Sequence, residues 1–141
     1  MRNKLIYAIF FVLCMTIILQ SCQNEEGIKY RRYYVNGKGL YEKNCQGCHG
    51  ADGSGLGTLY PPLTDINYLI RNKSKLACII RYGQNKAISI NNIPFQGKMP
   101  GYDAFAEIDI AQVIVYITNS FGNKQGFYGP EEVSKDLNIC N

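Results

Sequence analysis

Histidine, methionine and tryptophan are scarce in this sequence. Among its 141 residues there is one His, His49, there are three Met, and there is no Trp. A single imidazole excludes a metal site built from two or more His side chains, and it excludes an active site in which a pair of His residues transfers protons. Any imidazole chemistry in this protein therefore depends on His49.

The sequence also lacks a strong excess of charge of either sign. Its 15 Lys and Arg residues and 11 Asp and Glu residues give a formal net charge of +4, and two of the basic residues, Arg2 and Lys4, lie at the extreme N-terminus. Proteins that bind nucleic acid through its phosphates need a strongly basic surface. We therefore expect no nucleic-acid partner. The 46% of hydrophobic residues is enough for one globular domain.

No apolar run reaches the length of a typical membrane span. The longest, Leu5 to Leu19, is shorter than the roughly 20 residues that a spanning helix needs. It follows the basic start of the chain, which is the order of an export signal. It ends in Leu19-Gln20-Ser21-Cys22, which is similar to the lipobox of bacterial lipoproteins, where the Cys is acylated and becomes the mature N-terminus. We expect a lipoprotein signal peptide over residues 1–21 and a lipid anchor on Cys22.

Two alternative interpretations of this N-terminus are an ordinary cleaved signal and an uncleaved anchor helix. All three place the rest of the chain outside the cytoplasm. With the lipid on Cys22, the protein is anchored to the membrane of the cell envelope and faces the periplasm or the cell surface. The polar residues that follow, 22–34, are then expected to form a tether.

What the sequence does contain is the pentapeptide Cys45-Gln46-Gly47-Cys48-His49, and C-x-x-C-H is the attachment signature of c-type haem. Two thiols at this spacing reach the two vinyl groups of one porphyrin and become thioethers, while the imidazole of the next residue binds the iron. In bacteria this haem is attached outside the cytoplasm, which agrees with the predicted signal. The motif therefore predicts one covalently bound haem c per chain.

Two alternatives use the same residues. A redox-active disulfide between Cys45 and Cys48 needs a βαβ context, which the sequence does not show. A structural zinc site needs a fourth ligand from Cys78 or Cys140, without the usual second pair of ligands at short spacing. Haem accounts for both the residue types and their spacing.

Helical patterns account for most of the remaining sequence. Helices are expected over residues 37–45, 65–71, 74–82 and 107–121, with a short one from Glu131. Thr64 and Ser74 are the expected N-caps, and Gly83 and Gly122 the expected C-terminal ends.

Gly39 and the segment 87–93 give two further local predictions. Gly39 lies inside the first helix, where glycine usually marks the close crossing of another helix, and Tyr116 is the expected contact. The segment 87–93 is expected to be a loop with at most one bridge, because Pro94 and nearby glycines leave no partner for a strand.

The chain from about residue 35 to residue 123 resembles the class I c-type cytochromes. The matching pieces are Gly39-Leu40-Tyr41 before the haem motif, Pro61-x-Leu63, Gly97-x-Met99-Pro100, and a last helix with Ile110-Ala111-x-Val113 that leads to Phe121-Gly122-Asn123. The resemblance implies an all-α cytochrome c fold, with about four to five helices around one haem. One departure is Ala106, where the family often has a Ser or Thr cap, so Asp103 is the alternative cap of an earlier start.

The same resemblance implies a role for each site residue. Cys45 and Cys48 attach the haem, His49 is the proximal iron ligand and Met99 the distal one. The Pro61 carbonyl accepts the hydrogen of His49 Nδ1, and Leu63 and Phe95 pack on the porphyrin. Two alternatives for Met99 are a gap-filling core side chain and a site in which Lys98 or water takes the sixth position.

The function that follows is single-electron transfer between respiratory-chain proteins, without catalysis of any bond change. The expected partners are a donor dehydrogenase or quinol-linked complex and an acceptor reductase or oxidase. A fixed cytochrome subunit of a larger complex is the first alternative. A haem enzyme or gas sensor is less favoured, because it needs an open sixth position that Met99 would fill.

Two of the six cysteines are expected to pair with each other. The signal peptide carries Cys14 away, and lipid and haem use three more thiols, which leaves Cys78 and Cys140 to pair in an oxidising compartment. Two free thiols, or an intermolecular bond through Cys140, are the alternatives. The resulting division is a signal at 1–21, a tether at 22–34, a cytochrome domain at 35–123 and a tail at 124–141.

The lipid anchor gives a first testable prediction. The mature protein is expected to begin at acylated Cys22 and to sediment with membranes, and Cys22→Ser is expected to abolish acylation and stable membrane binding, which needs more than one acyl chain. Mass spectrometry of the N-terminal peptide and fractionation of cells measure both. A Cys22→Ser protein that begins at Met1 and remains fully with membranes would show instead that the anchor is a helix.

Overall fold

The computed structural model of the chain describes residues 2–21 and 25–140. The chain divides into two compact units, residues 1–31 and residues 32–141. The first unit contains α1 (Arg2–Ser21), and α2 (Glu25–Asn44) begins in it. Within the described part of the chain, no helix has both the length and the apolar character needed to cross a membrane. Cys22 lies outside the described residues, so its acylation stays a prediction, as does the division of the chain into four segments.

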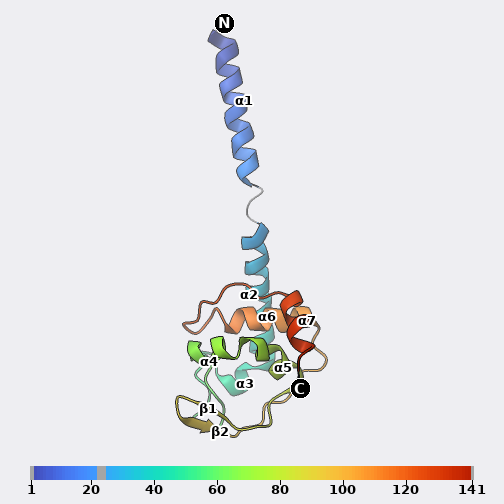
Figure 1. Ribbon diagram of the computed structural model, residues 1–141. Coiled ribbons are helices and arrows are strands. Elements are labelled where there is room, and N and C mark those ends of the chain that lie inside the picture. The colour runs from blue at the N-terminus through green and yellow to red at the C-terminus, as the bar shows by residue number, and fades with distance from the viewer. Residues whose placement is uncertain (1, 22–24, 141) are drawn as a thin grey trace. The chain divides into compact units, whose positions relative to one another are not determined.

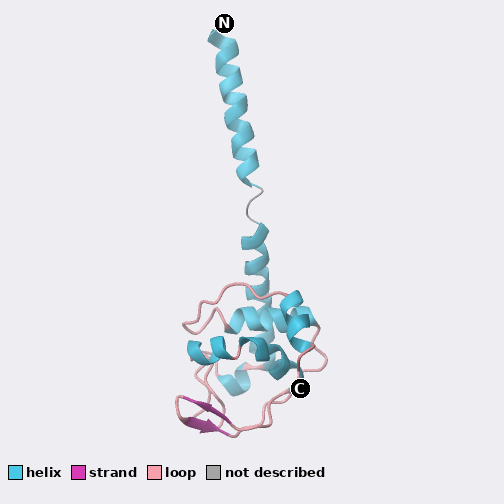
Figure 2. Ribbon diagram, viewed as in Figure 1, coloured by secondary structure: helices cyan, strands magenta, loops and turns pink. Residues whose placement is uncertain are grey.

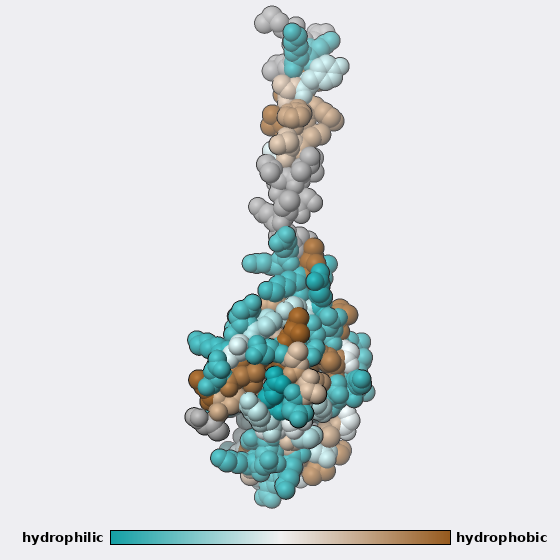
Figure 3. Space-filling view, turned by 90° about the vertical axis from the view of Figure 1, so that its right-hand side faces the viewer, coloured by the Kyte–Doolittle hydropathy of each residue, from teal (hydrophilic) through white to brown (hydrophobic). Residues whose placement is uncertain are grey.

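The fold of the second unit is all-α, as predicted (Figures 1 and 2). After α2 come four more α-helices and one 3-10 turn before the C-terminal helix: α3 (Gln46–His49), α4 (Ile66–Arg71), η2 (Lys73–Lys75), α5 (Leu76–Tyr82), α6 (Glu107–Ile117) and α7 (Pro130–Leu137). On the face shown in Figure 3, hydrophilic and hydrophobic residues of the second unit are intermingled.

Helix α2 begins earlier than the sequence predicts, inside the segment expected to be a tether. Residues 25–34 are helical rather than extended, and α2 begins twelve residues before the predicted helix at 37. Glu25 and Glu26 occupy its first turn, where the helix dipole favours negative charge. The helix buries only Tyr33, Gly37 and Tyr41, which recur every fourth residue. Such a narrow stripe leaves a polar helix without an apolar period, which is why the sequence suggested a linker.

Helix α6 is the centre of the core. All eight residues from Ile110 to Ile117 are buried, so the helix is surrounded by protein. It begins at Glu107, and the amide of Ala106 donates to the Asp109 carboxylate at 3.0 Å, so Asp103 does not cap it. It ends at Ile117 rather than at Phe121.

The early end of α6 has a local cause. Asn119 accepts hydrogen bonds from the amides of Gln125 and Gly126 and donates one to the Val115 carbonyl, so its side chain turns the chain away from the helix axis. Phe121 and Gly122 then both adopt positive φ angles, 57° and 87°. Gly122 therefore lies in the turn beyond the helix and does not cap its end.

Helices α2 and α6 cross at Gly37, not at Gly39. A Cβ atom on Gly37 would lie 1.9 Å from the Gln112 carbonyl oxygen and 3.0 Å from Tyr116 Cβ. A Cβ atom on Gly39 would meet nothing within 4 Å. Sequence identified the type of contact and its partner Tyr116, but with two glycines two residues apart it selected the wrong one.

The caps of the short helices also differ from expectation. Asp65 caps α4 by accepting a hydrogen bond from the Tyr68 amide at 2.7 Å, so Thr64 is not the cap. Ser74 lies within the 3-10 turn η2, and α5 begins at Leu76 without a side-chain cap. Gly83 ends α5 at φ 79°, as predicted.

A two-stranded hairpin replaces the expected loop at 87–93. Strand β1 (Ile88–Ile90) pairs antiparallel with β2 (Ile93–Phe95). Asn91 and Asn92 both have positive φ, as the favoured turn of a hairpin with a two-residue loop requires, and Asn tolerates this conformation. Pro94 pairs with Ser89, one pair away from the turn, and in such a hairpin this pair exchanges no backbone hydrogen bonds. The missing N–H of Pro94 therefore costs nothing.

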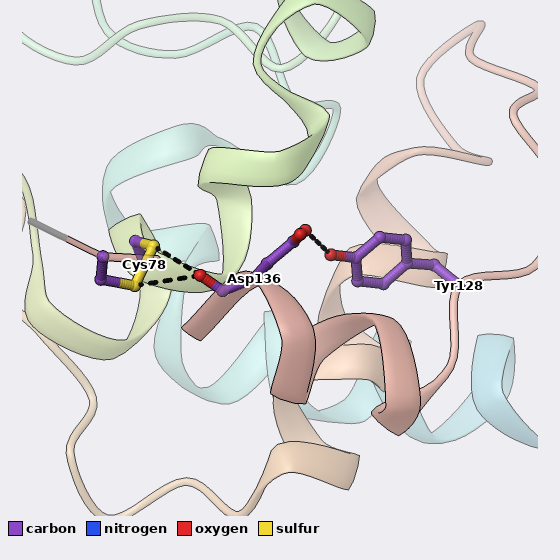
Figure 4. Close-up of a disulfide and its surroundings, with 4 residues drawn as sticks. Cys78, Tyr128 and Asp136 are labelled. Carbon is purple, nitrogen blue, oxygen red and sulfur yellow. Dashed lines mark hydrogen bonds between the residues drawn. A yellow bond between two sulfur atoms is a disulfide. The ribbon is translucent and has the colours of Figure 1, made fainter. Parts of the chain in front are cut away.

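The C-terminal tail is packed rather than free. Cys78 of α5 and Cys140 form a disulfide, the pairing that the sequence predicts (Figure 4). The Asp136 carbonyl oxygen lies 3.5 Å from both sulfur atoms, and the Asp136 carboxylate accepts a hydrogen bond from Tyr128. Burial, and then this bond, raise the pKa of Tyr128. Closing a loop of 62 residues contributes about 4 kcal/mol in the chain-entropy model.

The helix crossing gives a prediction with its control inside the same helix. Gly37→Ala is expected to lower the free energy of unfolding by about 1–3 kcal/mol or more, because the new methyl group must displace the α6 backbone. Gly39→Ala has open space and a better helix former, and is expected to raise it by about 0.5–1 kcal/mol. Denaturant unfolding of both variants measures the difference. Equal effects of the two substitutions would contradict the crossing at Gly37.

Candidate cofactor site

A single cavity in the second unit collects every residue that the sequence predicts for cofactor binding. Its wall includes all seven of them, Cys45, Cys48, His49, Pro61, Leu63, Phe95 and Met99. They come from the α2–α3 junction, the loop after α3, strand β2 and the loop before α6. Residues separated by more than fifty positions thus meet at one place.

The cavity is large and mostly apolar. Counting its open mouth, it contains about 1100 Å³ of space between atoms. The apolar part of its wall includes Leu69, Leu76, Ile79, Ile80, Ile88, Ile90, Val113 and Ile117. A site of this kind suits a large hydrophobic ligand and excludes water from it.

The two thiols lie where α2 passes into α3. The Cys45 amide donates to the Tyr41 carbonyl at 2.8 Å, and the amides of Cys48 and His49 both donate to the Cys45 carbonyl, at 3.1 and 3.0 Å. This tight turn holds both cysteines and the histidine on the wall of one cavity. Burial, and then the neighbouring Cys48, raise the pKa of Cys45 to about 11.

That environment argues against the two alternatives to haem. Redox-active Cys-x-x-Cys thiols have a lowered pKa, whereas that of Cys45 is raised. Cys78 and Cys140 are bonded to each other, so neither is available as a fourth zinc ligand. Among the described residues, no group of three or more His, Cys, Asp or Glu side chains is arranged to hold a metal ion.

His49 is held in one orientation by a hydrogen bond. It is only 9% exposed, and its Nδ1 lies 2.9 Å from the Pro61 carbonyl oxygen. Because a carbonyl oxygen can only accept, Nδ1 carries the hydrogen and Nε2 keeps its lone pair. Burial lowers the pKa of His49, which outweighs the opposing effect of the Pro61 bond and favours the neutral ring. A neutral imidazole with a free Nε2 is the form that binds a metal.

The glycine-rich loop brings the Pro61 carbonyl to His49. The Gly55 amide donates to the His49 carbonyl at 2.9 Å, and the Leu63 amide donates to the Gly53 carbonyl at 2.8 Å. Gly55 has φ +73°, and a Cβ atom there would lie 2.3 Å from the Tyr60 carbonyl oxygen and 2.9 Å from that of Pro61. The loop thus positions the acceptor of the His49 hydrogen bond.

Met99 is fixed through its backbone. Its amide and carbonyl exchange two hydrogen bonds with Gln84, each 2.9 Å long. A Cβ atom on Gly83 would lie 2.3 Å from the Met99 carbonyl oxygen, and one on Gly97 would lie 2.3 Å from that of Leu59. The lack of a side chain at Gly83 therefore allows the backbone to pack closely against Met99 itself. The lack of one at Gly97 allows the backbone just before Met99 to pack closely against Leu59.

Several polar residues on the cavity wall were not predicted. They are Asn44, Tyr60, Tyr68, Gln84, Lys86, Lys98 (as a wall residue) and Tyr102. The Tyr102 hydroxyl donates to the Asn44 carbonyl, and burial, with Cys45 and Cys48 nearby, raises the pKa of Tyr102. No motif identifies these residues, although Tyr102 stands three positions after Met99, close enough to have been included with it.

The residues present fit a haem. Two thiols in one turn, a neutral imidazole and a thioether line the same apolar cavity. Such a site can hold an iron porphyrin by two covalent bonds, bind its iron with nitrogen and sulfur, and keep water away.

Comparison with known proteins agrees with a haem site. Residues 34–120 match the family described as Cytochrome c. The chain is 35% identical over 92 residues to the cytochrome c subunit of alcohol dehydrogenase (quinone) from Gluconacetobacter polyoxogenes, and equally to that from Komagataeibacter europaeus. These matches cover 64% of the chain but 19% of each relative, so the chain spans about one fifth of their length. It is also 27% identical over 110 residues to cytochrome c-552 of Thermus thermophilus, covering 72% of the chain and 83% of that protein.

The glycine-rich loop gives a prediction that separates backbone strain from crowding. Gly57 also has a positive φ, +53°, but a Cβ atom there would meet nothing within 4 Å. Gly57→Ala is therefore expected to cost only the strain of a left-handed residue, about 1–2 kcal/mol. Gly55→Ala adds the displacement of the Tyr60–Pro61 backbone, a further 1–3 kcal/mol or so. Denaturant unfolding compares the two, and equal losses would contradict the role assigned to Gly55.

Proposed function

The chain belongs to the cytochrome c family, and from that premise we propose that its second unit is a single-electron carrier with one haem c, attached through Cys45 and Cys48. The observation that carries the proposal is the meeting of all seven predicted cofactor residues in one apolar cavity. The family implies covalently bound haem and electron transfer. One attachment motif in the sequence supports one haem per chain.

In this proposal His49 and Met99 would be the two protein ligands of the iron. His49 presents Nε2 because its Nδ1 is bonded to the Pro61 carbonyl. Apart from Met1 and Met15 in the predicted signal, Met99 is the only Met of the chain, and its backbone is anchored to Gln84. Leu63 and Phe95 belong to the same wall and supply apolar contacts to the porphyrin.

The protein's own contribution is to bind, orient and shield. Haem supplies reversible one-electron chemistry when it is bound. Thioether ligation by Met99 would stabilise reduced iron and so raise the potential. The hydrogen bond from His49 to Pro61 would tune the basicity of the His49 imidazole as a ligand. The apolar wall keeps the site in a low-dielectric environment, so that gain or loss of one electron requires little rearrangement of solvent.

We expect no catalysis at the iron, because of the residues that the chain provides around it. A haem enzyme or gas sensor needs an open or labile sixth position, which Met99 fills in this proposal. Peroxide chemistry also needs an acid–base group beside the iron, and the sequence has no second His to provide one.

A second candidate is a fixed electron-transfer subunit of a larger complex. The similarity to the cytochrome c subunits of two quinone alcohol dehydrogenases favours this candidate. The similarity to cytochrome c-552 gives it no such support, because that match covers most of the relative and not a small part of it. In both versions the partners are redox proteins, with a dehydrogenase or quinol-linked complex as donor and a reductase or oxidase as acceptor.

The proposed location follows from the N-terminus. We infer that residues 1–21 direct export and that lipid on Cys22 holds the protein at the cell envelope, with the haem unit facing the periplasm or the cell surface. Several acyl chains would give stable anchoring. The electron partners are therefore expected to be exposed on the same side of the membrane.

The ligand assignment gives the test of this function. The oxidised wild-type protein is expected to show the near-infrared sulfur-to-iron charge-transfer band, and Met99→Ala is expected to abolish it while the haem stays attached. Lys98→Ala is the matched control, because Lys98 lines the same cavity and is the alternative ligand, and it is expected to leave the band unchanged. A wild-type protein that lacks the band and binds carbon monoxide at once when reduced would favour the enzyme or sensor.

A further inference from the structure

Tyr102 connects two walls of the cavity. It lies three residues after Met99 and lines the same space. Its hydroxyl donates to the carbonyl oxygen of Asn44, which is the last residue of α2 and directly precedes Cys45. The bond thus joins the loop with the predicted distal ligand to the helix end that carries the first attachment cysteine.

The other anchors of this loop all lie on α5 and the residues just after it. Met99 pairs with Gln84, the Tyr102 amide donates to the Ile80 carbonyl at 2.9 Å, and Arg81 Nη1 donates to the Asp103 carbonyl at 2.7 Å. Gly101 is pressed against the same segment, since a Cβ atom there would lie 2.7 Å from the Arg81 carbonyl oxygen. These contacts hold one side of the loop, and the Tyr102 hydroxyl holds the side that faces α2.

The Tyr102 ring and its acceptor are both well placed. The ring stacks on Phe105 with centroids 5.0 Å apart and planes 26° from parallel, which fixes the direction of the hydroxyl. The Asn44 carbonyl is at a helix C-terminus, where carbonyl groups have no partner within the helix. The Asn44 side chain is occupied by its own bond to the Leu40 carbonyl at 2.9 Å.

We propose that Tyr102 is a positioning residue that closes the Met99 loop onto the α2–α3 junction, so that Met99 leaves the cavity only when the Tyr102–Asn44 bond opens. This inference rests on the proposed haem function for its consequence at the iron. The closure itself is a property of the polypeptide and does not depend on which residue binds the metal.

Replacement of the hydroxyl alone tests the closure. Tyr102→Phe keeps the ring and its stacking on Phe105 and removes one neutral hydrogen bond, which corresponds to a roughly 2- to 12-fold larger open population. Tyr82→Phe is the control: Tyr82 is on α5 beside the same loop, is 64% exposed, and its hydroxyl has no hydrogen bond to any residue in the described ranges.

Two readouts are measured on the haem-loaded proteins. The first is the rate at which the reduced protein binds carbon monoxide, which requires Met99 to leave. It is expected to rise roughly 2- to 12-fold in Tyr102→Phe and to stay at the wild-type value in Tyr82→Phe. The second is hydrogen exchange of the Met99 amide, which donates to Gln84, and it is expected to rise by a similar factor.

The two readouts separate failure of the closure from failure of the ligand assignment. Unchanged exchange of the Met99 amide in Tyr102→Phe overturns the closure, whatever binds the iron. Faster exchange in a protein whose wild type lacks the sulfur-to-iron band supports the closure and overturns the assignment of Met99. Equal acceleration in Tyr82→Phe also overturns the closure, because the effect would then not depend on the bond to Asn44.

Discussion

The hydrogen bond between His49 Nδ1 and the Pro61 carbonyl is the interaction on which the rest of the site depends. It selects the tautomer that leaves Nε2 free, and it fixes the ring of a side chain that is otherwise buried among apolar groups. Its acceptor is delivered by a loop whose turn requires Gly55, and that loop begins at the histidine itself. The glycines and the proline that follow the histidine in the sequence therefore serve to place and orient one imidazole ring, that of His49.

The helices supply the fixed frame for this bond. Helix α6 forms the buried centre, and α2 crosses it closely at Gly37, so the end of α2 and both cysteines are placed against the core. The fully buried Tyr41 donates its hydroxyl to the Gly50 carbonyl at 2.6 Å, which ties α2 to the loop after His49. The cavity thus lies between the core helix α6, which contributes Val113 and Ile117 to its wall, the end of α2, and the loops that carry Pro61 and Met99.

The residues that meet in the cavity were easier to predict from the sequence than local backbone structure. The haem motif, Met99 and the apolar stripe of α6 are recognisable because each combines residue types and a spacing that few structures use. The helical start at Glu25 was missed because only three residues of α2 are buried, and the end of α6 because it depends on bonds from Asn119 to residues six and seven positions later. The hairpin was missed because Pro94 was judged without its pairing register, which only the fold supplies.

Tyr102 shows the same limit within the site, since its partner is a backbone carbonyl and no side chain in the sequence reveals it. All functional roles proposed for these residues require one haem held by covalent bonds. The mass of the intact, unfolded protein, purified from cells that mature c-type cytochromes, measures this directly. The predicted mass is that of the processed chain plus one haem, retained after extraction with acid and organic solvent. A mass of the polypeptide alone, with the pigment in the extract, would contradict attachment at Cys45 and Cys48.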